Sequence, residues 1–207
     1  MTPQVGVYTG VDADADIAAH AADLDAHTKN ILEQSLVGGI YWGLPFRYRS
    51  FGAATANRLY GLVVFVARTM TFDAIYVAVT TGDAGKSARV GIYNLDSDLA
   101  PSTLVQDYGT LSVAAAAIVS AVADQQLTKG YYLTVFISDG TPDVEFLYPA
   151  VSPLGHKLND LDIVHAGYQV DDPSPPAIFN ALPASFPAGP TLTHAVPDTL
   201  LKVKSLD

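Results

Sequence analysis

The chain of 207 residues contains no cysteine and few basic side chains. Without cysteine there is no disulfide, no thiolate metal ligand and no cysteine nucleophile, so stability rests on the burial of apolar surface. The 11 Lys and Arg residues stand against 21 Asp and Glu residues, which gives a formal net charge of -10. Binding to a phosphate backbone needs clustered basic side chains. The composition therefore argues against a nucleic-acid partner.

Long hydrophobic runs are also missing. The longest are LVVFVA at 62–67 and VAAAAIVSAVA at 113–123, well short of the roughly 20 residues that a membrane span requires. Hydrophobic residues nevertheless make up 49% of the chain and charged residues only 15%. This balance is typical of a folded domain with a real core. The length fits one large β domain or two small ones.

The segment 12–37 is predicted to form one long helix. Asp12, Asp14 and Asp16 supply an N-cap and negative charge for the first turn, and Gly38-Gly39 provides a stop. Within the segment Ile17, Leu24 and Ile31 recur every seven residues. That spacing is typical of a narrow coiled-coil seam.

Two registers of this seam remain open. If the three apolar residues occupy a positions, His20, His27 and Gln34 face the bundle axis. If they occupy d positions, Ala21, Thr28 and Ser35 fill a, and the histidines move to the flanking g sites. The second register is favoured because imidazoles stacked on an axis are costly to desolvate. The predicted oligomerisation residues are Ile17, His20, Ala21, Leu24, His27, Thr28 and Ile31.

Residues 38–207 are predicted to form a mainly β domain, an antiparallel β-sandwich of jelly-roll type. Alternating apolar residues and frequent turn residues predict strands near 41–50, 58–68, 72–80, 87–94, 104–113, 117–124, 130–138 and 143–149. Alanine propensity alone would make VAAAAIVSAVADQQL a helix, but the alternation within IVSAVA favours a strand. The Pro-rich segment 150–190 is interpreted as an ordered meander leading to a closing strand near 199–205.

Several groups of residues resemble metal or catalytic sites, but each has a simpler interpretation. The DADAD sequence at 12–16 lacks the Gly and Glu of a calcium loop and fits helix capping better. NLDSD at 94–98 and HKLNDLDIVH at 156–165 fit solvated loops better than cation sites. Asp143 and Glu145 could share a strand face, but glycan cleavage needs two acids converging across a groove. We therefore predict no enzymatic activity, no metal site and no cofactor.

Aromatic side chains are the better candidates for binding. Tyrosine and tryptophan offer flat apolar faces with polar tips, which suit contacts with sugars and proteins. Many of them are expected to be core or interface residues instead. The predicted ligand or receptor surface consists of Tyr93, Asp96, Asp98, Tyr131 and Tyr168.

Three stretches resemble a β-sandwich module of tailed-phage structural proteins. They are SARVGIYNLDSDLAPSTLVQDYGTLSV, QQLTKGYYLTVFISDG and LPASFPAGPTLTHAVPDTLLKVK. The helical sequence HAADLDAHTKN is also similar to segments near the start of phage tail and fibre proteins. The matching residues of the β module are Arg89, Gly91, Ile92, Tyr93, Pro101, Leu104, Asp107, Gly109, Leu127, Gly130, Tyr132, Leu133, Leu182, Pro183, Ala184, Phe186, Pro187, Ala188 and Gly189.

The resemblance implies a homotrimeric fibre, spike or decoration protein on the virion surface, in the tail, baseplate or capsid. A thin heptad seam fits this expectation, because three copies could stabilise a helix that is weak alone. Residues 1–11 are predicted to anchor the chain to other virion proteins through Val5, Val7 and Tyr8. The expected function is attachment to a host glycan or surface protein; the alternative is a capsid decoration or connector protein that only stabilises the particle.

Overall fold

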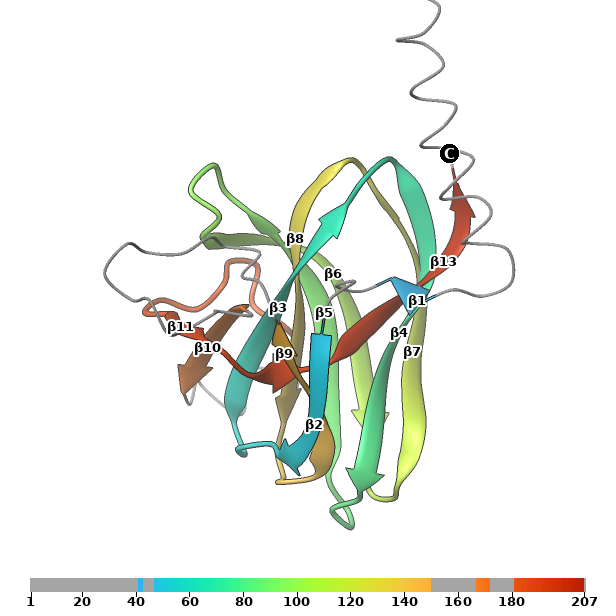
Figure 1. Ribbon diagram of the computed structural model, residues 1–207, viewed down its shortest axis with the longest axis vertical. Helices are drawn as coiled ribbons and strands as arrows, with labels where there is room; N and C mark the ends of the chain where they lie inside the picture. The colour runs from blue at the N-terminus through green and yellow to red at the C-terminus, as the bar shows by residue number, and fades with distance from the viewer. Residues whose placement is uncertain (1–40, 43–46, 150–166, 172–180, 207) are drawn as a thin grey trace, which may run out of the picture. The chain divides into compact units, whose positions relative to one another are not determined.

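The computed structural model describes residues 41–42, 47–149, 167–171 and 181–206, and the structural statements that follow concern these residues. They form two antiparallel β-sheets, here called sheet A and sheet B (Figure 1). None of the described residues belongs to a helix long and apolar enough to cross a membrane. The predicted anchor at 1–11 and the predicted helix at 12–37 lie outside the described residues.

Sheet A has seven strands. Its central strand β4 lies between β7 on one side and β13 on the other, and β9 joins the β13 side of β4 near Val79. The remaining strands add to this framework: β1 pairs with β13, while β2 and β12 pair with β9. The strands are β1 (Tyr41–Trp42), β2 (Arg47–Ala53), β4 (Met70–Thr81), β7 (Ala117–Leu127), β9 (Asp143–Pro149), β12 (Val196–Pro197) and β13 (Thr199–Leu206).

Sheet B has six strands in the order β11-β10-β3-β8-β5-β6. Its middle is formed by β3, β8 and β5, which pair over most of their lengths. The strands are β3 (Arg58–Val66), β5 (Ser87–Leu95), β6 (Pro101–Ser112), β8 (Gly130–Ser138), β10 (Gly167–Asp171) and β11 (Thr191–Thr193).

The two sheets pack face to face as a β-sandwich, as the alternation in the sequence predicts. Side chains at every second position point inward, among them the fully buried Phe136 of β8. In β4 a register shift between Phe72 and Ala74 changes the phase, so that both Phe72 and Ile75 are fully buried. The rings of Tyr60 in sheet B and Phe146 in sheet A meet edge to face, with centroids 5.8 Å apart. The hydroxyl groups of Thr134 and Thr199 also meet across the interior, 2.5 Å apart.

The strand predictions differ from the structure where short strands lie near prolines or turns. The predicted strand 41–50 is two strands with different partners, because β1 pairs with β13 and β2 with β9. Strand β10 lies inside the segment interpreted as a meander and was not predicted. The predicted strand over VAAAAIVSAVADQQL is confirmed by β7. The last strand, β13, spans the residues of the predicted closing strand.

Candidate functional site

Sheet B carries apolar residues on both faces. Its even-numbered residues in β3 and β8 face sheet A, as the contacts of Tyr60 and Thr134 demonstrate. The odd-numbered residues therefore point to the outer face. There Val63 pairs with Leu133, and Phe65 pairs with Tyr131. The outer face is divided into a covered part and an exposed part.

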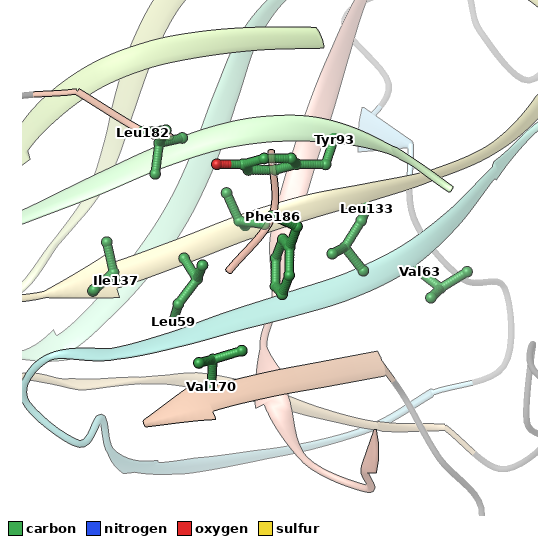
Figure 2. Close-up of a cluster of buried hydrophobic side chains, with 9 residues drawn as sticks. Leu59, Val63, Tyr93, Leu133, Ile137, Val170, Leu182 and Phe186 are labelled. Atoms are coloured by element: carbon green, nitrogen blue, oxygen red, sulfur yellow. The ribbon is translucent and has the colours of Figure 1, made fainter. Parts of the chain in front are cut away.

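The covered part lies beneath the segment 181–190. Phe186 meets the ring of Tyr93 edge to face, with centroids 5.2 Å apart. The Tyr93 hydroxyl donates a hydrogen bond of 2.8 Å to the carbonyl oxygen of Pro183. Figure 2 shows Phe186 below the ring of Tyr93, with Leu59 and Leu133 on either side. The segment thus builds a second hydrophobic core on the outside of the sandwich.

Gly91 of β5 leaves room for the segment 181–190 to pack against sheet B. A Cβ atom on Gly91 would lie 2.3 Å from Leu182 Cδ1 and 2.7 Å from the carbonyl oxygen of Gln106. Such distances are far inside van der Waals contact, so any larger residue would displace the segment. Gly91 therefore fixes how closely Leu182 approaches β5.

A part-buried ion pair between Arg89 and Asp107 holds the same segment. The Arg89 guanidinium donates to both carboxylate oxygens of Asp107, and its shortest contact is 2.6 Å. Asp107 also accepts hydrogen bonds from the backbone N–H groups of Leu182 and Gly109. Burial raises the pKa of the Asp107 carboxyl, but the hydrogen bonds from Arg89, Leu182 and Gly109 outweigh it and leave the pKa below its ordinary value.

The exposed part contains an aromatic pair. Phe65 is 38% exposed and Tyr131 is 41% exposed. Their ring centroids are 4.8 Å apart and the rings are tilted by 44°. Two neighbouring rings on a strand pair form a rigid apolar platform, since each side chain is limited to a few rotamers.

The turn at 96–100 lies at the same end of sheet B. Asn94 of β5 pairs with Tyr132 of β8, so the chain enters the turn beside Tyr131. The Asp96 carboxylate accepts hydrogen bonds from the N–H groups of Asp98 and Ala100, both 2.9 Å. Asp98 itself is exposed. We call Phe65, Tyr131 and the turn 96–100 the aromatic surface.

Tyr168 connects this turn to strand β10, toward the opposite edge of sheet B. It lies on β10, opposite Gly61, and its hydroxyl donates a hydrogen bond of 2.7 Å to the carbonyl oxygen of Leu99. Leu99 has a φ of 61°, an unusual value for leucine. Burial, and to a lesser degree the charge of Asp96, raise the pKa of Tyr168. The phenol thus remains a neutral donor that holds the turn in place.

The structure separates the predicted ligand residues into three groups. Tyr131 and Asp98 are exposed and belong to the aromatic surface. Asp96 and Tyr168 have structural roles in the turn. Tyr93 is fully buried, so it belongs to the outer core and not to a ligand surface. Phe65 was absent from the predicted set. The alternation of β3 could have placed Phe65 on the same face as Val63, but it could not have predicted that Phe65 is exposed.

Many residues of the three sequence motifs at 87–113, 125–140 and 182–204 meet at the covered part. Arg89 binds Asp107, Asp107 binds Leu182, and Tyr93 binds Pro183 and packs on Phe186. Gly109 has a φ of 84°, which glycine adopts at little cost. These motif residues hold the segment 181–190 against sheet B. In the structure their role is architectural.

The acidic candidates for metal or catalysis are dispersed. The turn 94–98 uses Asp96 to bind backbone N–H groups, and Asp143 and Glu145 lie on β9 opposite Ala53 and Phe51 of β2. Within the described part of the chain, no three His, Asp or Glu side chains gather as a metal site would require. The DADAD sequence and the histidines and aspartates of 156–165 lie outside the described residues, as do all seven predicted oligomerisation residues and the anchor residues Val5, Val7 and Tyr8.

Comparison with models of protein families gives no match, and no curated protein matches the sequence.

Proposed function

We propose that the chain is a non-enzymatic structural protein of a tailed-phage virion that attaches the particle to a host surface. The observation that carries this proposal is the aromatic surface, where the exposed rings of Phe65 and Tyr131 lie beside a polar turn. The sequence resemblance described above supports the virion context. The passage of successive strands from one sheet to the other, as in β2 to β3 to β4 to β5, supports the finer expectation of a jelly-roll topology.

The chemistry of the aromatic surface suits a glycan. The C–H groups on one face of a sugar ring pack well on an aromatic ring, while its hydroxyl groups need acceptors nearby. Phe65 and Tyr131 provide the apolar platform, and the exposed carboxylate of Asp98 provides an acceptor in the adjoining turn. A shallow surface of this kind binds weakly in a single copy. Three copies held together by the predicted helix at 12–37 would strengthen attachment by multivalency.

The proposal is tested by the binding of purified full-length protein to glycan arrays and host cells. We expect the double substitution Phe65→Ala and Tyr131→Ala to reduce binding at least tenfold, because it removes the apolar platform. Phe51→Ala is the matched control, since Phe51 is 68% exposed on β2 and lies outside the aromatic surface. Equal binding by the double variant and the control would contradict a role of the aromatic surface. Release of sugar fragments would instead indicate an enzyme.

A decoration or connector protein is the second candidate. The observation that favours it is the exposed apolar strand β7, whose Ile118 and Val122 are 73% and 76% exposed. Such a strand suits assembly more than recognition of a sugar. Particles lacking the protein should then lose resistance to heat or salt while still adsorbing to cells. Normal particle stability combined with lost adsorption would support attachment instead.

A further inference from the structure

Strand β7 (Ala117–Leu127) is an edge strand with little protection. Within the described residues it pairs with β4 alone, so over Ala117–Ala123 its other side carries backbone N–H and C=O groups without strand partners. It lies at the margin of sheet A in Figure 1. Exposed edges of this length invite pairing with another strand.

The usual devices that block such pairing are missing over the first seven residues of β7. Residues 113–123 contain no charged residue, no proline and no glycine. The pairing of β7 with β4 is regular from Ala117 to Val122, and the irregularity lies beyond, opposite Phe72–Ala74. The first charged side chain is Asp124, which is bound to Lys204. Natural edge strands of similar length normally carry a charge or a bulge in the middle.

The outward face of β7 is apolar as well. Ile118 and Val122 are 73% and 76% exposed, and Ser120 between them is also exposed. They lie beside Ala78, Tyr76 and Ala74 of β4, whose side chains share this face. Exposed β-branched residues on a flat strand pair are stabilised by a cross-strand partner.

We propose that β7 pairs antiparallel with β7 of a second copy of this chain, across a twofold axis at Ser120. The two copies of sheet A then join into one continuous sheet. In this register Ile118 lies opposite Val122 of the partner subunit, and Val122 lies opposite Ile118 of the partner subunit. Each exposed β-branched side chain thereby gains a β-branched neighbour, and the interface is self-complementary as a twofold axis demands.

The distribution of charge makes β7 the place where a second copy can approach with the least repulsion. With a net charge of -10, two copies repel each other over most of their surfaces. The neutral stretch of β7 is a place where backbones can approach without bringing carboxylates together. In the proposed register the two Asp124 residues lie about 27 Å apart along the strands, at ~3.4 Å per residue. This separation exceeds the screening length of ~8 Å at physiological ionic strength.

This interface goes beyond the proposed function and is separate from the predicted helix at 12–37. If that helix forms trimers, each trimer presents three β7 strands and β7 pairing joins it to at least one further trimer; if it does not, β7 pairing joins two single chains. In both cases loss of the β7 interface lowers the number of copies per assembly in solution at least twofold. Glycan binding through Phe65 and Tyr131 is measured independently, so the two proposals can fail separately.

The test is the molar mass of the full chain by light scattering coupled to size-exclusion chromatography. We expect the double substitution Ile118→Lys and Val122→Lys to lower the mass at least twofold, because four lysines would meet across the axis. The control is Phe51→Lys, which adds a charge to an exposed residue of β2 in the same sheet and should leave the mass unchanged. An unchanged mass for a folded double variant would overturn the proposal.

A second variant decides the question if the lysine variant fails to fold. The chain has no cysteine, so Ser120→Cys introduces a single reactive thiol. Opposite residues on antiparallel strands have Cβ atoms about 5 Å apart, within reach of a short bismaleimide. We expect Ser120→Cys to be cross-linked into dimers on denaturing gels, and Thr110→Cys, exposed on edge strand β6, to remain single. The absence of cross-linking at Ser120→Cys would refute the twofold pairing.

Discussion

Asp107 joins three separate parts of the chain at one carboxylate. Its partners are Arg89 on β5, Gly109 two residues along β6, and the backbone of Leu182 in the covering segment. A carboxylate that accepts several hydrogen bonds favours its charged form strongly. The ionisation of Asp107 therefore contributes to the attachment of residues 181–190 to sheet B, beside the hydrogen bond of Tyr93 to Pro183 and the packing of Phe186.

We expect Asp107→Asn to lower the free energy of unfolding by about 1–3 kcal/mol at neutral pH, because Arg89 loses its charged partner. Urea unfolding followed by circular dichroism measures the change. Asp98→Asn is the control, since Asp98 is exposed in the turn 96–100 and should leave stability nearly unchanged. A loss below a few tenths of a kcal/mol for Asp107→Asn would contradict this role.

The contribution of Asp107 should also depend on pH. Its folded-state pKa is lowered, so its stabilisation is fully present above the ordinary aspartate pKa of about 3.9 and is lost as the pH falls through the lower folded value. The stability difference between wild type and Asp107→Asn should therefore be larger at about pH 6 than at about pH 2, because the charge of Asp107 stabilises the fold less as the pH falls below the ordinary aspartate pKa. Equal stability differences at both pH values would contradict the conclusion that the ionised form of Asp107 stabilises the fold.

At the level of strands and sheets, one polar contact links the two layers. Thr134 of β8 and Thr199 of β13 are 1% exposed, and their hydroxyl oxygens lie 2.5 Å apart. Thr134 also lies 3.3 Å from the carbonyl oxygen of Leu62. The contact is enclosed by apolar side chains, where an unpaired hydroxyl is costly.

We expect Thr134→Val alone to cost about 1–3 kcal/mol, because it leaves the buried Thr199 hydroxyl without the Thr134 hydroxyl. Thr199→Val alone should cost less, because the Thr134 hydroxyl keeps its hydrogen bond to the Leu62 carbonyl oxygen. The double substitution should cost less than the sum, since valine has nearly the shape of threonine and no hydroxyl is left unpaired. Urea unfolding of the four proteins gives the coupling energy. Strictly additive losses would mean that the two hydroxyl groups act independently.

The sequence predicts the individual strands better than it predicts which strands pair with each other. The alternation of Ile118, Ser120 and Val122 outweighs alanine propensity in β7, because one face of the strand packs on the core and propensity is the weaker effect. Strand β10 has only five residues and is followed by a proline-rich stretch, so its alternation is too short to recognise. Its pairing with β3 is set by packing between residues a hundred positions apart, which no local pattern encodes.

The candidate site was predicted only in part for the same reason. Tyr93 and Tyr131 look alike in the sequence, since both lie on alternating strands and both point to the outer face of sheet B. What distinguishes them is the segment 181–190, which covers Tyr93 and ends short of Tyr131. Whether a strand side chain is exposed depends on residues distant in the sequence that pack over it. Exposure therefore cannot be predicted from the strand's own sequence.

For the whole molecule, net charge opposes association while the apolar strand favours it. A chain with a net charge of -10 repels its own copies, and salt reduces that repulsion. We expect association through β7 to strengthen severalfold as NaCl rises from about 10 mM to about 150 mM, because the screening length shortens from ~30 Å to ~8 Å. Analytical ultracentrifugation at both concentrations measures it. Weaker association at the higher concentration would indicate an interface built on ion pairs.

The position of β13 determines when the domain can finish folding. This strand is the last in the described chain, yet it lies between β4 and β1 and occupies the β4 edge opposite β7. During synthesis β4 is complete more than a hundred residues before its partner emerges from the ribosome. Until then one edge of β4 stays open in the nascent chain, where it is vulnerable to mispairing with neighbouring chains. The sandwich therefore closes only after synthesis of its C-terminal strand, and nascent chains that stall before β13 should be prone to aggregation.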